Sequence, residues 1–442
     1  MPELPPTEAL LIAGSDPRLS LDPTTGANHY LCRPTPDSEL LCFGSSTAST
    51  ISPRGLAIAD RLRNQLAEEM HNQPPEQVFA HHITRIQQAL RAALQLEQAT
   101  SIHLTESGTS AHRLAVAQIP PTHPLQVLMV EASETGRGVP TALADNGNHC
   151  REIAIRHADG APRASTAIDD DFRTHTQQAI EAGRQVLLVL VDQSKSGIIA
   201  PSLPCARKLR DQFPERVQLL VDGCQFRFST DTLRNYLKHG LMVAITGSKF
   251  LAGPSFSAAL LIPPRHAREG WNPAFPQPPT TQRIHPGLLV RWQVALDTLQ
   301  QLQQLIPSQI DGFTAKFNTV ITDHLQKHPL LAPLPTTAAP LPTIFPFRLR
   351  PQPDAPWCSL SQTLTIYQHL QHSGTPRIQF GRPIRGGLGS DGTPIGALRL
   401  CLSARIIVDA LANNQQDATI DQAITALDRA TEATRESHFP RN

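Results

Sequence analysis

A repeated alternation of short apolar runs with helix-length segments, across the middle of the chain, most constrains the fold. The apolar runs are nearly continuous in Val, Leu and Ile and lie at residues 102–105, 126–130, 185–191, 217–221 and 241–245. Strands that are buried on both faces of a parallel sheet have sequences of this kind. Most of the runs are separated by helix-length segments, among them residues 111–118, 174–182 and 206–213. The pattern predicts an α/β fold with a mostly parallel central sheet and right-handed crossovers.

The segments on either side of these runs predict two further units. Residues 1–45 contain several Pro, Gly and Asp and are expected to form an irregular N-terminal arm. Residues 46–300 are expected to form the large α/β domain, in which residues 256–262 return antiparallel after the last parallel strand. From about residue 286 a long helical pattern links this domain to a smaller C-terminal α+β domain at residues 301–442.

The charge balance and the cysteines exclude several classes of protein. The 442 residues include 39 Lys and Arg against 38 Asp and Glu, so we expect neither a nucleic acid nor an anionic membrane as partner. The seven cysteines are scattered without a CxxC pair, which argues against a disulfide framework and against a metal site. The sequence shows neither a signal peptide nor 18 consecutive apolar residues, so we expect a cytoplasmic protein without a membrane span.

Small polar loops follow five of the apolar runs. They lie at residues 106–110, 131–138, 192–197, 222–225 and 246–249. Ligands of open parallel sheets bind beyond the carboxyl ends of the strands, where these loops would meet. One such loop means little, but five at one edge predict a small-molecule site.

The first loop has the composition of a phosphate cradle. Ser107, Gly108, Thr109 and Ser110 stand where a helix is expected to begin, and exposed N–H groups at a helix N-terminus bind phosphate. The alternative is that Ser107 simply caps the helix, since Ser and Thr are favoured there. The chain lacks a GxxxxGK[ST] loop, and the GxGxxG at residues 387–392 does not join a strand to a helix.

Asp222 closes the otherwise apolar run RVQLLVD. A carboxylate at such a position is costly unless it has a cationic partner, and a protonated pyridine nitrogen is one. Gln225, three residues later, could donate to the phenolic oxygen of the same ring. The alternative is a strand-end Asp that caps the next turn.

Two lysines compete as the reactive amine. Lys249 follows an apolar run in TGSKFLAGPSFSAALLIP, and burial among small and apolar neighbours favours the neutral amine that Schiff-base formation requires. Lys195 lies in the loop DQSKSG and is the rival. A lone Lys is otherwise a solvated surface residue.

The order SGTSA, VDGCQ and TGSK resembles the fold-type-I enzymes that use pyridoxal 5′-phosphate (PLP), and it is most similar to their class V aminotransferase and cysteine desulfurase branch. The resemblance spans roughly residues 45 to 300. It implies a Schiff base on Lys249, an ion pair of Asp222 with the ring nitrogen, and a contact of Gln225 with the ring. It also implies phosphate contacts from Gly108, Thr109, Ser110, Thr246 and Ser248.

The sequence departs from that branch at three places. Ser248 stands where desulfurases have a His before the Lys, and VEASETGRG offers only Glu134 and Thr135 where they have a His over the ring. The loop DQSKSG replaces a cofactor-contacting Asn. We expect Asp192 and Ser194 to contact the cofactor there, and Gln193 is an alternative to Ser194.

The C-terminal third provides a candidate for holding a substrate carboxylate. The family uses an Arg of the small domain as a bidentate fork, and ALRLCLSARII offers Arg399, with Arg405 second. A structural ion pair is the alternative for Arg399. Cys358 corresponds only weakly to the sulfur-accepting cysteine of desulfurases, because APWCSLSQTL is typical of a helix start.

These observations predict a PLP-dependent enzyme that transforms an α-amino acid, of the aminotransferase type. The alternatives are a lyase that cleaves a C–S or C–C bond and a non-catalytic scaffold with this fold. Proteins of this kind are homodimers with shared active sites. The segment 41–52, LCFGSSTASTIS, is suited to packing near a polar pocket, so we expect a homodimer.

Overall fold

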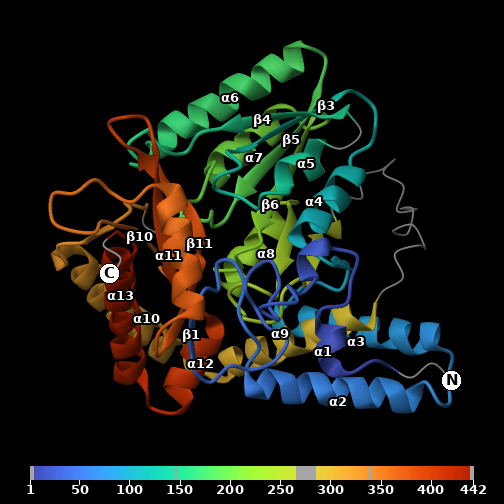
Figure 1. The fold of residues 1–442 in the computed structure, drawn as a ribbon. Helices are drawn as coiled ribbons and strands as arrows, with labels where there is room; N and C mark the ends of the chain where they lie inside the picture. Colours follow the sequence, from blue (N-terminus) through green and yellow to red (C-terminus); the bar gives the residue numbers. More distant parts are fainter. Residues whose placement is uncertain (1–3, 145–146, 265–284, 338–340, 439–442) are drawn as a thin grey trace.

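The apolar runs of the middle of the sequence form a seven-stranded sheet in the computed structural model, which describes residues 4–144, 147–264, 285–337 and 341–438 (Figure 1). The strand order is β2-β8-β7-β6-β5-β3-β4. Strands from β4 through β7 pair in parallel, whereas β8 is antiparallel to β7 and β2. The strands are β2 (Ser101–Thr105), β3 (Leu125–Val130), β4 (His149–Ile153), β5 (Gln185–Val191), β6 (Val217–Gly223), β7 (Met242–Thr246) and β8 (Ala258–Ile262).

The mostly parallel sheet and the antiparallel return of β8 are thus confirmed. The edge strand β4 was not predicted, because its sequence HCREI is mostly polar and largely exposed. An edge strand pairs on one side only and needs no continuous apolar run.

Helices cover both faces of this sheet, which is why its strands are apolar throughout. Alternate residues of β5 enter different hydrophobic clusters: Leu187 packs with Ala111 and Ala115, whereas Leu188 packs with Phe172. One face carries α4 (Gly108–Ala117) and α5 (Val139–Ala144), and the other carries α6 (Ser165–Glu181), α7 (Leu203–Gln212) and α8 (Thr230–Lys238).

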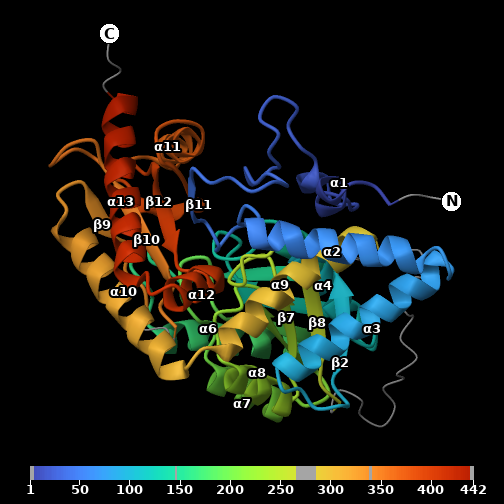
Figure 2. The same cartoon turned by 90° about the horizontal axis from the view of Figure 1, so that it is seen from below.

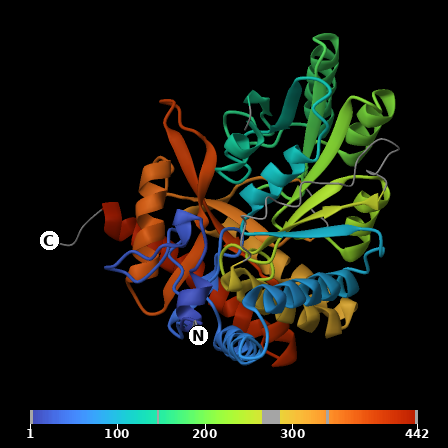
Figure 3. The same ribbon diagram turned by 90° about the vertical axis from the view of Figure 1, so that its right-hand side faces the viewer.

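A second, five-stranded sheet lies beside the first, with the order β1-β11-β12-β10-β9. Its first strand comes from the N-terminal arm and runs parallel to β11, so the arm is not irregular throughout. In Figure 3 the blue arm lies beside the orange strands of this sheet. The strands are β1 (Leu40–Phe43), β9 (Leu331–Pro333), β10 (Ile344–Leu349), β11 (Arg377–Leu388) and β12 (Pro394–Cys401).

The remaining helices connect the two sheets. The helix α9 contacts α1, α2, α3 and α12, and Figure 2 shows α2 and α3 alongside it. It ends before Pro307, which begins α10. The elements are α1 (Thr7–Leu11), the 3₁₀ helix η1 (Pro17–Leu19), α2 (Pro53–Glu69), α3 (Pro75–Ala93), α9 (Pro286–Gln304), α10 (Pro307–Lys327), α11 (Leu360–His372), α12 (Ala404–Ala412) and α13 (Gln416–His438).

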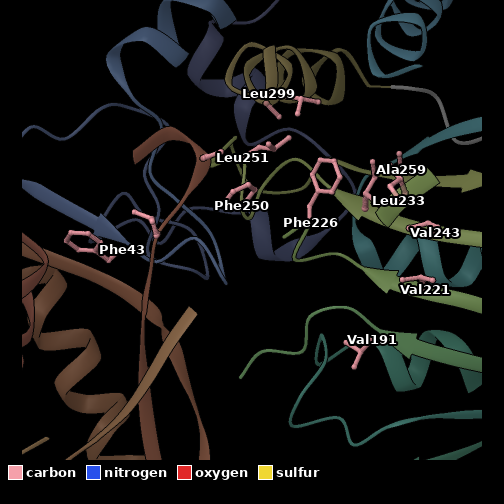
Figure 4. Packing of buried hydrophobic residues seen from close by; sticks show 14 of the residues in the cluster. Phe43, Val191, Val221, Phe226, Leu233, Val243, Phe250, Leu251, Ala259 and Leu299 are labelled. Atoms are coloured by element: carbon pink, nitrogen blue, oxygen red, sulfur yellow. The ribbon is translucent and has the colours of Figure 1, made fainter. Parts of the chain in front are cut away.

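The main hydrophobic core runs from the central sheet into the second one. Figure 4 follows it from Val221 and Val243 on neighbouring strands to Leu251 and then to Phe43 in β1. This continuous core holds the strand ends of the first sheet against the second sheet, where the cavity described next is found.

Within the described ranges, none of the helices is both long and apolar enough to cross a membrane.

Candidate active site

A cavity of about 220 Å³ lies where the carboxyl ends of β6 and β7 face the second sheet. Its walls come from the loops after β2, β3, β5, β6 and β7, from β11 and β12, and from the N-terminal arm. An engineered cavity of about 150 Å³ holds a benzene ring. This space is therefore sufficient for a substituted aromatic ring, and the predicted convergence of the strand-end loops is confirmed.

Asp222 lines the cavity and pairs with a histidine that the sequence did not single out. The Nε2 of His112 lies 3.5 Å from Oδ2 of Asp222, and its Nδ1 is 2.6 Å from the carbonyl oxygen of Gly108. Burial opposes charge on the carboxylate, but His112, the charge of Lys249 and the hydrogen bond from Cys224 together outweigh it and hold the pKa of Asp222 below its usual value. Burial likewise opposes charge on His112, yet the pKa of that histidine is raised by Asp222. The cavity thus ends on an ionised carboxylate.

The N-terminus of α4 forms another wall. Ser107 caps the helix by accepting a hydrogen bond from the N–H of Ser110, so the capping alternative holds for its side chain. Gly108 and Thr109 line the cavity at the first helical positions, where N–H groups lack intrahelical acceptors. A Cβ at Gly108 would come within 2.8 Å of Sγ of Cys224, so a side chain is excluded there. This wall can hold an anion through backbone donors.

Both candidate lysines line the cavity. Lys249 lies in the loop after β7, which also contributes Ser248, and Thr246 at the end of β7 lines the cavity as well. The Nζ of Lys195 lies 3.3 Å from the carbonyl oxygen of Ser133. Burial, followed by the charges of Arg399 and Lys249, lowers the pKa of Lys195 to about 7. The two side chains thus share one space at the cavity wall.

Arg399, in β12, is a buried guanidinium at the cavity wall. Its Nη2 donates to the carbonyl oxygen of Arg382 at 2.7 Å and to Oγ1 of Thr47 at 2.8 Å. Neutral oxygens surround it, and burial lowers its pKa. Among the described residues no carboxylate pairs with Arg399, and a buried cation of this kind favours an anionic ligand.

Neither a protein-family model nor a curated protein sequence matches the chain, but solved structures do. A NifS-like protein from Rickettsia africae matches over 89% of this chain and 99% of that chain, at 13% identity and a TM-score of 0.57. A cystine C-S lyase in complex with its product cysteine persulfide matches over 84% and 97%, at 15% identity and a TM-score of 0.57. The serine palmitoyltransferase of Sphingomonas wittichii matches over 89% and 88%, at 13% identity and a TM-score of 0.56.

The chain has the type I fold of PLP-dependent enzymes. The fold class predicted from the sequence is thereby confirmed, including the mostly parallel sheet and the smaller C-terminal α+β part.

Within this type I fold, the cavity brings together eight of the predicted site residues. These residues are Ser107, Gly108, Thr109, Asp222, Thr246, Ser248, Lys249 and Arg399. Their individual roles stay predictions, as does that of Ser110, whose hydroxyl lies 3.0 Å from that of Ser107.

Three other predicted cofactor contacts have their side chains engaged elsewhere. The amide nitrogen of Gln225 donates to the carbonyl oxygen of Ser46 at 3.0 Å. Asp192 accepts a hydrogen bond of 2.6 Å from the hydroxyl of Tyr236, and burial raises the pKa of Asp192 to about 6. Neither residue lines the cavity, so the structure does not bring Gln225 and Asp192 to it, and their contacts with a cofactor stay predictions.

Ser194 is held by a buried ion pair. Its hydroxyl donates to Glu134 at 2.8 Å, and Glu134 pairs with Nε of Arg156 at 2.9 Å. A buried carboxylate needs several donors, and the loop after β5 supplies them through Ser194 and Ser196. Ser194 does not line the cavity, and its contact with a cofactor stays a prediction.

The arm and two arginines were missed as parts of the site. His29 and Tyr30 of the arm, together with Arg137 and Arg382, line the cavity. His112 had a usable signal, since it lies four residues after Gly108 and therefore on the same face of α4 as that glycine.

Proposed function

We propose that the protein is a PLP-dependent enzyme that transforms an α-amino acid, with Lys249 as the attachment point of the cofactor. The observation that carries the proposal is the meeting of Lys249, the ionised Asp222 and the N-terminus of α4 around one cavity. An aldehyde, a basic ring nitrogen and a phosphate are the three groups that such walls would recognise. PLP carries all three on one ring.

The residues present fit that group. The Nε2 of His112 lies 3.5 Å from Oδ2 of Asp222, as an ion pair and not a hydrogen bond, and among the described residues Asp222 accepts a hydrogen bond from the N–H of Cys224 at its other oxygen. Asp222 thus keeps capacity for a cationic N–H of a bound ring. Gly108 and Thr109 offer backbone donors for the phosphate, and Thr246 and Ser248 lie nearby on the same wall.

Bound PLP supplies an electron sink that weakens the bonds at the α-carbon of an amino acid. Asp222 would keep the ring nitrogen protonated, because His112 holds that carboxylate in its ionised form. Arg399 would orient the substrate by a bidentate bond to its α-carboxylate. Lys249, once released, could move a proton at the α-carbon.

We propose transamination as the reaction class, with carbon–sulfur cleavage as the second candidate. Lys249, which lines the cavity together with Asp222, suits the proton transfer at carbon that transamination requires. A sulfur-transferring desulfurase needs a reactive thiol. Cys224 lines the cavity, but burial raises its pKa, and burial also raises the pKa of Cys358 to about 11. The second candidate is supported by the similarity to a cystine C-S lyase.

We also propose that the protein works as a homodimer. Ser46 and Thr47 of the small-residue segment line the cavity of their own chain, together with His29 and Tyr30 of the arm. The arm thus places its polar residues at the cavity, which is where a second subunit would complete the site.

The test is spectroscopic and chemical. The purified protein, loaded with PLP, is mixed with single amino acids, and the visible absorbance band of the bound cofactor is followed while the products are identified. Keto-acid formation supports transamination, and release of sulfide or persulfide supports the lyase. A protein that binds PLP and responds spectrally but turns over no amino acid would be a scaffold, against the proposal.

A further inference from the structure

The charges around the cavity are strongly unbalanced. Among the described residues that line it, six side chains are cationic and only Asp222 is anionic. The cationic ones are Arg18, Arg137, Lys195, Lys249, Arg382 and Arg399. The whole chain is nearly neutral, so this excess is local.

Three of these side chains already have a partner or a proposed role. Arg18 is paired with Asp16 at 2.5 Å and lies over the ring of Phe256. Lys249 and Arg399 have the roles proposed above, in the attachment of PLP and in binding the α-carboxylate. Arg137, Lys195 and Arg382 remain.

Arg137 and Arg382 make no ion pair with a carboxylate anywhere in the part of the chain that the structure describes. The Nη1 of Arg382 instead lies 2.9 Å from Nε2 of His29. Burial, and then the charges of Arg382 and Arg137, lower the pKa of His29, so this histidine stays neutral and accepts the hydrogen bond. The charge of Arg137 also acts on Lys195, which places the three cations near one another.

The exposure of these residues locates the charge at the opening of the cavity. Arg137 is exposed and Arg382 is half-buried, whereas Arg399 is buried. A ligand whose α-carboxylate reaches Arg399 would therefore present its other end to Arg137 and Arg382. Guanidinium groups recognise carboxylate, sulfonate and phosphate through paired N–H donors.

We infer that Arg137, Arg382 and Lys195, here named the cationic mouth, bind a second anionic group on the side chain of the substrate. The substrate class is an amino acid whose side chain ends in a carboxylate, a sulfonate or a phosphate. This inference rests on the proposed function and extends it by naming the substrate class. Neutral amino acids of the same size would leave the cationic mouth without a counter-charge.

The test compares acids with their neutral isosteres by binding. Calorimetric titration of the PLP-loaded protein with succinate and with its monoamide succinamate needs no reaction, because neither has an amino group. We expect succinate to bind at least about 10-fold more tightly, equivalent to about 1.4 kcal/mol, and its advantage to shrink as salt is added. Spectral titration with aspartate, cysteate and phosphoserine, each against asparagine, identifies the preferred anion.

Variants then assign the effect to the cationic mouth. Arg137→Gln combined with Arg382→Gln should bring the preference for succinate over succinamate to within about 2-fold. Arg385→Gln is the matched control, since Arg385 is exposed on the same strand as Arg382 and does not line the cavity. It should keep the preference. The single Arg137→Gln variant changes only an exposed side chain, so it provides a folded variant that should lose part of the preference.

The outcomes separate the two proposals. Equal binding of acid and amide by a protein that shows the PLP band would overturn the cationic mouth and leave the proposed function standing. A protein that takes up no PLP would overturn the proposed function. Loss of PLP affinity in the double variant, with the preference for the acid unchanged, would assign the two arginines to the cofactor phosphate and overturn the inference.

Discussion

The buried amine of Lys195 lowers the stability of the folded protein, and this effect can be measured without knowing the substrate. Its amine is largely buried at the cavity wall, 3.4 Å from the carbonyl oxygen of Ala132 and 3.3 Å from that of Ser133. Burial and the charges of Arg399 and Lys249 lower its pKa from 10.5 to about 7. We predict that Lys195→Met, a replacement of similar length without the charge, stabilises the cofactor-free protein.

The sign and size of the effect follow from proton linkage. The unfolded chain binds a proton at Lys195 below pH 10.5, whereas the folded protein binds it only below about pH 7. The unfolded state therefore holds more protons between these values, and stability rises with pH across this window. The two pKa values of Lys195 differ by about 3.5, and each pKa unit corresponds to about 1.36 kcal/mol. The buried amine therefore lowers the free energy of unfolding by roughly 5 kcal/mol below pH 7. At pH 9 the remaining cost is roughly 2 kcal/mol.

Urea unfolding of the cofactor-free protein at pH 6 and pH 9 measures this difference. Lys195→Met should stabilise the protein at both values, by about 2 to 3 kcal/mol more at pH 6 than at pH 9. Lys208→Met, on the exposed face of α7, is the control and should stay within about 0.5 kcal/mol of the parent. A gain that is absent, or equal at the two pH values, would refute the reasoning from burial.

Three further predictions concern the carboxylate of the cavity and the assembly. Asp222→Asn should fold normally but slow turnover by about 100-fold or more, and an unchanged steady-state rate would remove the ion-pair role. His112→Gln removes the charge that holds the pKa of Asp222 low, so the acidic limb of the pH–rate profile should move to higher pH; an unmoved limb would assign His112 to packing alone. Sedimentation at low micromolar concentration should show a dimer burying more than about 2,000 Å², and a fully active monomer would contradict the shared site.

The sequence predicts well what depends on local pattern. The run QVLLVLV is buried at every position because both faces of β5 are covered, and that burial is visible as a continuous apolar run. Asp222 closes one apolar run and Lys249 follows the next one, and these positions likewise predict that the two residues meet at one edge of the sheet. The strand β1 is not predicted by local patterning, because its partner strand β11 begins at Arg377, far away in the sequence.

Side-chain partners explain the remaining differences. Gln225 and Ser194 stand where a ligand contact was expected, but Ser46 and Glu134 engage them from distant parts of the chain. The same holds for Arg382, whose neighbour His29 lies 353 positions away. Such pairings follow from the packing of the two sheets and have no periodic signal in the sequence.

The central claim, that PLP is attached at Lys249, is tested most directly by borohydride reduction of the PLP-loaded protein, followed by proteolysis and mass spectrometry. Lys195 lines the same cavity and serves as an internal alternative. We predict that the pyridoxyl group is found on the peptide that contains Lys249, and that Lys249→Ala abolishes the visible band while Lys195→Ala retains it. A pyridoxyl group on Lys195, or on neither lysine, would contradict the account.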